Sequence, residues 1–308
     1  MKKLLAITNH FNPSPEVPLI FAETPKGMEI HSSFWNQLLY FYDGKNKHTL
    51  FFETNKKPND LTPLDKYDGL YIRSDGPVDN DTMSIVLREA ERRNIPKLGF
   101  HPYVGGSRIG SKADTMHFCN TNLDMLFPMS FFGKYTMIEK YFDTIVKKIG
   151  LPFVCKPNNL SKGRGVSLIH SKKELKKYFS EILEEYGTKK SYFLAQKYIK
   201  NKGDVRVLVI GKKTHAIRRY TEAKDEFRNN VSLGGETQKI TISTETKKLM
   251  KKIVKKLNLD FAGIDYIEYG KKQIFLEVNR TPGLTGVSGA HNKNMFKETM
   301  DYIYKKIK

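Results

Sequence analysis

The stretch that decides the fold is FAGIDYIEYGKKQIFLEVN, residues 261–279. Apolar and polar residues alternate in both halves, which is typical of paired β-strands, and Gly270-Lys271-Lys272 suits a three-residue hairpin loop. That loop predicts these cross-strand pairs: Tyr269 with Gln273, Ile267 with Phe275, and Asp265 with Glu277. Because side chains point alternately to the two faces of a strand, Asp265, Glu277 and Asn279 should share one face.

Asp265, Glu277 and Asn279 form a candidate metal site. Two carboxylates directly opposite each other repel unless a cation or a proton lies between them. Mg²⁺ accepts carboxylate and amide oxygens and keeps water or substrate phosphate in its other positions, and Mn²⁺ is a possible substitute. The alternative is that the three side chains form the exposed polar face of an edge hairpin.

Net charge divides the chain into two parts. Lys and Arg number 53 against 33 Asp and Glu, a formal charge of +20, and 42 of the basic residues are Lys. Residues 1–110 carry 14 basic and 13 acidic side chains, so +19 lies in residues 111–308. With 39% hydrophobic residues the chain can bury a large core, which excludes a disordered basic tail. The excess positive charge suggests an anionic partner.

Cysteine content and hydropathy exclude further classes. Two cysteines, Cys119 and Cys155, are too few for a disulfide framework or a tetrahedral zinc site, which fits a reducing cytosol. The apolar run after Met1 stops at Thr8, short of a signal peptide, and no window approaches 18 consecutive apolar residues. We therefore expect a cytoplasmic protein without a membrane segment.

The pattern of strands and helices predicts an α/β protein of three parts. Residues 1–110 predict strands at 4–8, 49–53 and 69–73 and a helix at 82–93, an order that suggests a small open parallel sheet. Residues 111–190 predict helices at 111–120, 135–149 and from Ser171, with strands at 153–156 and 166–169. Residues 191–308 predict strands at 192–196, 205–210 and 215–219, the hairpin, and helices at 244–257 and 294–307.

A second candidate site is a glycine-bearing turn. It contains Lys162, Gly163, Arg164 and Gly165 and follows a short apolar strand that ends at Lys156. Glycines let backbone N–H groups approach phosphate oxygens, and a lysine on the preceding strand can reach the same space. The alternative is an ordinary turn between strands. The sequence contains neither a Walker A loop nor a Gly-x-Gly-x-x-Gly dinucleotide fingerprint.

Arginines supply a third set of candidates. Alternation along the strand places Asp204 and Arg206 on one face. Arg228 with Asn230 offers donors of the kind that hold transferring phosphoryl or carboxylate groups. Arg218 and Arg219 are candidates to border a substrate pocket, although an ordinary surface position is the favoured interpretation for Arg219.

Taken in order, these segments resemble the ATP-grasp superfamily, and most closely the branch of the ribosomal-protein glutamate ligase RimK. The resemblance covers about residues 110–300 and rests on these motifs: Val154-Cys155-Lys156 with Gly163-Arg164-Gly165-Val166, Leu194 to Ile199, Asp204-Val205-Arg206, Phe227-Arg228-Asn229-Asn230, Phe261 to Asp265, and Phe275 to Leu284. It implies an ATP-grasp fold with two α+β lobes, at 111–190 and 191–308, preceded by a small open parallel-sheet domain at 1–110.

The resemblance also implies a role for each matched position. Contacts with ATP phosphates are implied for Lys112, Lys156, Lys162, Gly163, Arg164 and Gly165. An adenine-binding hinge that acts through its backbone is implied for Gln196, Lys197, Tyr198 and Ile199, with Asp204 at the ribose. Lys197 departs from the family, whose members usually carry Glu there. Catalytic contacts with the transferring phosphoryl group are implied for Lys156, Arg228 and Asn230, and Mg²⁺ ligation for Asp265, Glu277 and Asn279.

The implied activity is ATP-dependent carboxylate–amine ligation. A carboxylate attacks the γ-phosphate to give an acylphosphate, and an amine then displaces phosphate to form an amide or peptide bond. Phosphoryl transfer asks the protein mainly for positioning and charge neutralisation, which the predicted cations supply. We expect an amino acid to be added to an acidic peptide or small-molecule acceptor. Two alternatives stay open: the same chemistry on a nucleic acid or modified base, suggested by the net charge, and an ATP-binding regulatory protein without turnover.

Overall fold

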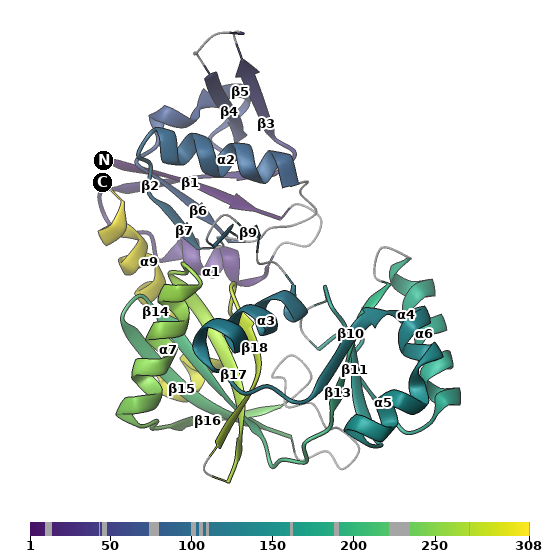
Figure 1. Cartoon of the computed structure of the whole chain (residues 1–308). Coiled ribbons are helices and arrows are strands. Elements are labelled where there is room, and N and C mark those ends of the chain that lie inside the picture. The colour runs from purple at the N-terminus through teal and green to yellow at the C-terminus, as the bar shows by residue number, and fades with distance from the viewer. Residues whose placement is uncertain are drawn as a thin grey trace.

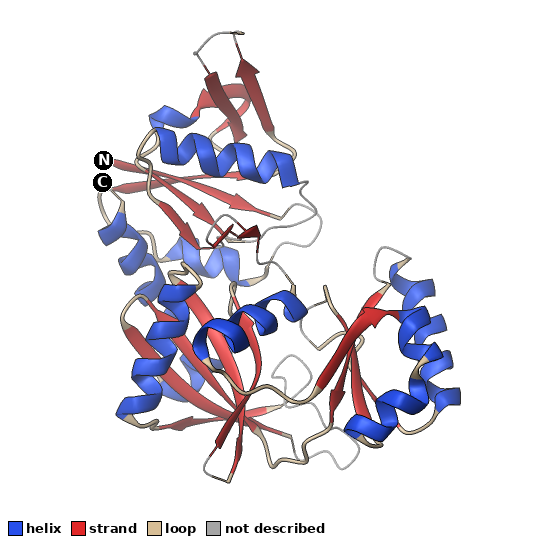
Figure 2. Cartoon of the chain, viewed as in Figure 1, coloured by secondary structure: helices blue, strands red, loops and turns tan. Residues whose placement is uncertain are grey.

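The computed structural model describes the whole chain except residues 10–13, 43, 45–47, 74–79, 100–102, 105–106, 109–110, 161–162, 188–190, 222–234, 271 and 308. Three larger sheets organise the described residues, with helices packed against each of them (Figures 1 and 2). No helix among these residues is long and apolar enough to cross a membrane.

The N-terminal residues form a parallel sheet, as predicted; it has four strands, of which β2 was not predicted. Its order is β2-β1-β6-β7, with bounds β1 Lys2–Thr8, β2 Met28–Phe34, β6 Gly69–Ile72 and β7 Lys97–Gly99. On one face, Leu5 and Ile7 of β1 pack with helix α2 (Asn80–Arg92). On the other face, Leu4 and Ala6 join a core shared with α1 (Glu16–Ala22) and the C-terminal helix α9 (Met295–Lys306). Both faces are therefore buried, which explains the continuous apolar run of β1.

A small antiparallel sheet extends from this parallel sheet, at the top of Figure 1. It has the order β3-β4-β5, with bounds β3 Leu38–Tyr42, β4 His48–Thr54 and β5 Lys57–Pro63, and the short helix η1 Leu64–Lys66 follows it. The predicted strand at 49–53 exists as β4, but it belongs to this sheet. Strand β3 was not predicted, although a short run of apolar and aromatic residues without alternation is compatible with a strand. A short hairpin, β8 Tyr103–Val104 and β9 Ser107–Arg108, follows β7.

The second large sheet is antiparallel, with the order β10-β13-β11-β12. Its bounds are β10 Ser130–Lys134, β11 Phe153–Pro157, β12 Ser167–Ile169 and β13 Tyr192–Lys197. Helices α4 (Tyr135–Lys140), α5 (Phe142–Ile149) and α6 (Lys172–Tyr186) pack on it around Phe153 and Phe193. The single helix predicted over 135–149 is wrong, because Tyr141 leaves helical geometry with φ −100° and ψ 26°. No glycine or proline marks that break in the sequence.

The third large sheet has five antiparallel strands in the order β16-β15-β14-β17-β18. Its bounds are β14 Asp204–Ile210, β15 Lys213–Tyr220, β16 Glu236–Ile240, β17 Phe261–Tyr269 and β18 Lys272–Asn279. Helices α3 (Lys112–Leu123) and α7 (Thr244–Lys256) contribute to its main core, and α8 (Thr285–His291) to the core shared with β1. Cys119 and Leu123 of α3 thus pack against this sheet rather than the second one. The division at 110 and 190 stays a prediction.

The register of the β17–β18 hairpin differs in part from the predicted one. Asp265 lies opposite Glu277, as expected, but the strands turn between Tyr269 and Lys272, which pair with each other, so the loop is one residue shorter than predicted. An irregularity after Asp265 leaves Leu276 as an extra residue on β18 and restores the expected pairing. The predicted pairs of Tyr269 with Gln273 and Ile267 with Phe275 are therefore wrong.

Candidate active site

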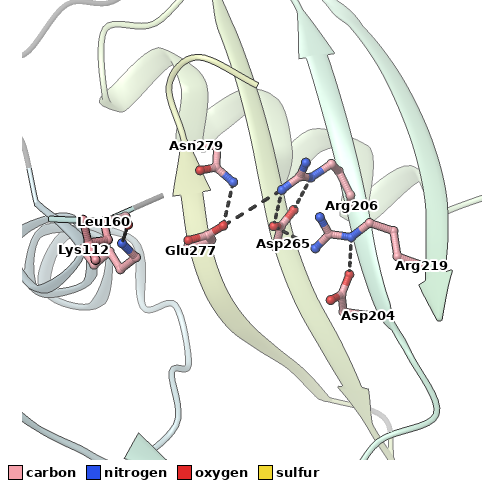
Figure 3. Close-up of polar contacts among 8 residues, drawn as sticks. All are labelled: Lys112, Leu160, Asp204, Arg206, Arg219, Asp265, Glu277 and Asn279. Carbon is pink, nitrogen blue, oxygen red and sulfur yellow. Dashed lines mark hydrogen bonds and ion pairs between the residues drawn. The ribbon is translucent and has the colours of Figure 1, made fainter. Parts of the chain in front are cut away.

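The centre of the candidate site is a row of charged side chains across four strands (Figure 3). Asp265 on β17 lies opposite Glu277 on β18 and opposite Arg206 on β14, while Asp204 on β14 lies opposite Arg219 on β15. Since β14 and β17 occupy the middle of the sheet, their polar side chains are largely covered, and Asp265 keeps only 1% of its surface exposed. The predicted shared face of Asp265 and Glu277 is confirmed by this register.

Two arginines neutralise Asp265. Arg206 binds it through two hydrogen bonds, Nε to Oδ1 at 2.8 Å and Nη2 to Oδ2 at 2.6 Å. Arg219 donates from Nη2 to Asp265 Oδ2 at 2.9 Å and from Nε to Asp204 Oδ1 at 2.7 Å. Nη2 of Arg206 also lies 4.0 Å from Glu277 Oε1. The cation that two facing carboxylates require is thus supplied here by the guanidinium of Arg206.

Burial and these arginines act on the carboxyl groups in opposite directions. Burial alone would raise the pKa of Asp265, but Arg206 and Arg219 outweigh it and hold that pKa below its ordinary value. Burial dominates at Asp204, so its pKa is raised even though Arg219 opposes the change. Burial would lower the pKa of Arg219, but Asp265 and Asp204 raise it, so this arginine stays charged.

Glu277 and Asn279 are the more accessible acidic and amide groups of the row. The side chain of Glu277 is 30% exposed, and its Oε1 accepts a hydrogen bond of 2.8 Å from Asn279 Nδ2. That bond fixes the amide so that Asn279 Oδ1 remains as an acceptor. Carboxylate and amide oxygens suit Mg²⁺, so this donor set fits the ion. Within the described part of the chain, no cluster of three or more His, Cys, Asp and Glu side chains is arranged to hold a metal by itself.

Lys156 brings the second sheet into the site. It lies on β11, is buried, and interacts electrostatically with Glu277 and Asp265 of the third sheet. Burial lowers its pKa to about 8, Glu277 and Asp265 oppose that decrease, and Lys112 adds to it. Lys156 therefore lies within electrostatic range of Lys112 and of the two candidate carboxylate ligands, Asp265 and Glu277.

Lys112 is held by the segment that follows β11. Its Nζ donates to the carbonyl oxygen of Leu160, and Ala113 N donates to Asn158 Oδ1 at 2.9 Å. Ser111 caps the start of α3 by accepting a hydrogen bond from Asp114 N. The start of α3 is thus bound to the segment between β11 and β12, although α3 itself packs on the third sheet.

The described part of the glycine-bearing segment forms a turn, as predicted. Gly163 and Gly165 adopt φ values of +71° and +64°, which side chains other than glycine rarely tolerate. A Cβ atom on Gly165 would lie 2.9 Å from Pro157 Cγ, and Tyr178 Oη donates to the Gly165 carbonyl at 2.6 Å. Arg164 between the two glycines is exposed, and Lys162 lies outside the described residues.

The predicted hinge connects the second and third sheets. Gln196 is buried, and its Nε2 donates to Ser130 Oγ at 2.8 Å, so its side chain has a structural contact. Lys197 is exposed and ends β13, while Tyr198 and Ile199 lie in the segment that leads to Asp204. The Ile199 carbonyl accepts a hydrogen bond from Asn201 Nδ2 at 2.9 Å. Contact with adenine or ribose stays a prediction for these residues.

The arginine predictions have mixed outcomes. The favoured surface interpretation of Arg219 is wrong, because its side chain is 3% exposed and paired with two aspartates. Arg218 is partly exposed and donates to Glu268 Oε2 at 2.5 Å. Substrate contact stays a prediction for both. Arg228 and Asn230 lie outside the described residues.

Two residues of the N-terminal part reach the segment after β18. Glu16 Oε1 accepts hydrogen bonds from Leu284 N, Thr285 N and Thr285 Oγ1 at 2.8, 2.9 and 2.7 Å. Arg73 donates from Nη2 to Glu16 Oε2 and to the Pro282 carbonyl, both at 2.9 Å. Sequence reasoning missed both residues, since the segment after β18 that they contact lies more than 200 positions away. Arg206 was placed on the correct face but was assigned no partner.

Comparisons with known proteins agree with this arrangement. The probable alpha-L-glutamate ligase 2 of Hahella chejuensis is 33% identical over 167 residues, which cover 54% of this chain and 54% of that protein. A protein of the same name from Shewanella baltica is 29% identical over 224 residues, covering 72% and 71%. The match thus spans about half the length of the Hahella relative.

Solved structures share the fold. The ATP-grasp ligase PsnB, complexed with a phosphomimetic variant of its minimal precursor, Mg and ADP, is similar with a TM-score of 0.68 at 17% identity, covering 99% of this chain and 98% of that one. This confirms the expected fold of two α+β lobes preceded by a parallel-sheet domain. A family model described as a RimK-like ATP-grasp domain matches residues 130–303, more than half of the chain. The chain therefore belongs to the RimK-like ATP-grasp family.

Proposed function

We propose that this protein is an ATP- and Mg²⁺-dependent ligase that joins a carboxylate to an amine. The observation that carries the proposal is the electrostatic interaction of buried Lys156 on β11 with Glu277 on β18, two strands of different sheets. A buried lysine within electrostatic range of an oxygen-donor pair supplies what a triphosphate with its metal requires: a cation for the phosphate oxygens and ligands for the ion.

Glu277 and Asn279 would hold the metal ion. When bound, Mg²⁺ supplies charge neutralisation at the phosphate oxygens. Both oxygens of Asp265 are engaged by arginines, so its task in the described arrangement is to fix Arg206 beside Glu277. We propose direct ligation by Asp265 only when Arg206 releases one of these oxygens.

The remaining groups would bind and orient the nucleotide. Lys156 and Lys112 would bind phosphate oxygens, and the backbone N–H groups of Gly163 to Gly165 would approach them closely, because no side chain of the glycines intervenes. The segment from Gln196 to Ile199 would contact adenine through its backbone. Lys162, Arg228 and Asn230 would complete the phosphate contacts, as the family resemblance implies.

For the substrates, we propose the addition of glutamate to the carboxylate of an acidic peptide. Two considerations support this choice: relatives are named alpha-L-glutamate ligases, and PsnB is complexed with a peptide precursor. The charge of +19 over residues 111–308 favours an anionic acceptor. The relatives give no support to the nucleic-acid alternative.

The test is ADP release from ATP and Mg²⁺ with each of the twenty amino acids, in the presence of acidic peptides or of RNA, followed by mass analysis of the product. We expect release to depend on glutamate and a peptide, and the peptide mass to rise by one glutamate residue. Lys156→Ala and Glu277→Ala should abolish release, whereas Lys173→Ala on the exposed side of α6 should not change it. Full activity of both site variants would refute the assignment.

A further inference from the structure

Strand β3 presents an unusual concentration of exposed apolar surface. Its last four residues are exposed, with Leu39 at 60%, Phe41 at 56% and Tyr42 at 56%. None of residues 38–42 carries a charge. A contiguous group of large apolar side chains in water is rare on a soluble protein unless another surface covers it.

The small sheet β3-β4-β5 continues this surface on one face. The register places Leu39 opposite Phe51 of β4 and Phe41 opposite Thr49, while Leu61 of β5 lies opposite Glu53 on the same face. Leu61 is 42% exposed. The apolar surface therefore extends from the edge strand across the sheet.

Strand β3 is also an edge strand. In the described part of the chain it pairs only with β4, so one side of its backbone carries N–H and C=O groups directed away from the sheet. Natural proteins usually protect such edges with charges, prolines or a covering segment. The sequence Leu38-Leu39-Tyr40-Phe41-Tyr42 has no charge or proline of this kind.

Hydrogen bonds and ring stacking hold the sheet β3-β4-β5 in position against the end of α2. Arg93 of the helical turn after α2 donates from Nη2 to the His48 carbonyl at 2.6 Å, and Arg92 donates to the same oxygen at 3.3 Å. The His48 ring in turn stacks on Tyr42 with centroids 4.9 Å apart, and on Tyr40 at 6.0 Å. The exposed edge is thus preorganised, which lowers the entropy cost of covering it.

We propose that the occupant of this surface is a second copy of the chain, paired antiparallel through β3 about a two-fold axis at Tyr40. In this register Tyr40 faces Tyr40 of the other copy, Leu39 faces Phe41, and Leu38 faces Tyr42. Every pair is apolar or aromatic, the kind that stabilises neighbouring strands. Two three-stranded sheets then become one continuous six-stranded sheet.

The charge distribution favours a second copy over an acidic or basic partner. Residues 1–110 carry a net charge of only +1, whereas +19 lies in the rest of the chain. Contact through β3 therefore joins the two nearly neutral parts and keeps the strongly basic parts away from the contact. An anionic partner would find no charge on β3 to recognise.

The available apolar surface is of the size a dimer needs. Aromatic side chains bury about 150–250 Å² each, so the partly exposed Tyr40, Phe41 and Tyr42, with Leu39, offer several hundred Å² per copy. Interfaces of specific complexes begin at about 1,000 Å² in total, counted over both partners. Two copies of this surface reach that range together with the backbone pairing.

Sedimentation equilibrium of the full chain tests the proposal. We expect a dimer, and we expect Phe41→Lys to raise the dimer dissociation constant by at least about 100-fold, because two-fold symmetry removes each buried side chain twice. The matched control is Tyr269→Lys, another exposed aromatic residue, 61% exposed on the β17–β18 hairpin. A monomeric wild type, or a Phe41→Lys variant that dimerises as tightly as the control, would overturn the proposal.

A cross-linking experiment tests the register independently of affinity. The proposed axis brings residue 40 of both copies within about 4.5–5.5 Å between Cβ atoms, close enough for a disulfide after small adjustment. Tyr40→Cys should therefore give a covalent dimer on mild oxidation, and Tyr269→Cys should not. The natural Cys119 and Cys155 are buried and should not interfere. Equal cross-linking of the two variants would contradict the register, and ligase activity is not needed for either readout.

Discussion

Replacing Arg219 by methionine should destabilise the fold, because it removes a cation from the buried row of charged side chains. Arg219 is 3% exposed and neutralises two aspartates, Asp204 at 2.7 Å and Asp265 at 2.9 Å. Methionine keeps much of the volume but removes the cation. Breaking a buried ion pair by removing one partner costs about 3–5 kcal/mol, because a buried charge is left uncompensated. Arg206 still binds Asp265, so the larger part of this cost falls on Asp204.

The loss of folding stability in Arg219→Met should also depend on pH. In the wild type, the lowered pKa of Asp265 stabilises the fold above the ordinary value of 3.8, and this contribution disappears only as the pH falls through the lower folded-state pKa. Without Arg219, burial acts on Asp204 with less opposition, and its already raised pKa should rise further. The variant can then bind a proton at mildly acidic pH that the unfolded chain does not bind. The difference in unfolding free energy between the wild type and the variant should therefore become smaller as the pH falls from 7.5 to 5.5.

Urea denaturation followed by circular dichroism at these two pH values measures both effects. The control is Arg218→Met, the neighbouring position, whose pair with Glu268 is exposed and should contribute less than about 1 kcal/mol. A loss for Arg219→Met no greater than for Arg218→Met would refute the reasoning about burial. A deficit that stays the same at both pH values would refute the reasoning about Asp204.

Three further predictions concern the site and the basic helix. ATP affinity, measured by titration of the apo protein, should fall as the pH rises through about 8, where Lys156 loses its proton, and Lys156→Arg should remove that decline. Glu277→Gln should weaken Mg²⁺-dependent nucleotide binding at least about tenfold, while Glu268→Gln should leave it unchanged, as calorimetry would show. Lys251→Glu on α7 should raise the free energy of unfolding by about 1 kcal/mol, because it converts the like-charge pairs with Lys247 and Lys255 into attractive ones, and the urea midpoint measures this. An unchanged midpoint would indicate that those lysines do not interact.

Local pattern predicted most elements but not every connection between them. The strands around Asp204 and Phe261 and the helices near Thr244 and Asn294 follow from their periodicity, and the structure confirms them. The hairpin register failed beyond Asp265, because an extra residue on β18 shortens the loop without changing the alternation near Glu277. The break at Tyr141 also has no local signal, since the spacing of Ile138, Phe142 and Ile145 suits one helix as well as two.

The sequence by itself determined which chemical groups this protein brings to its site. Glycines with positive φ, a lysine at the end of a buried strand, and carboxylates that alternate along a hairpin are local properties, so they can be recognised within a few residues of each other. Only the tertiary structure decided how these groups are charged and held. Arg219 changed from a surface candidate to a buried partner of Asp265, 46 positions away, and Lys156 came within electrostatic range of Glu277. Pairing between distant strands and packing between sheets depend on contacts that no single segment contains.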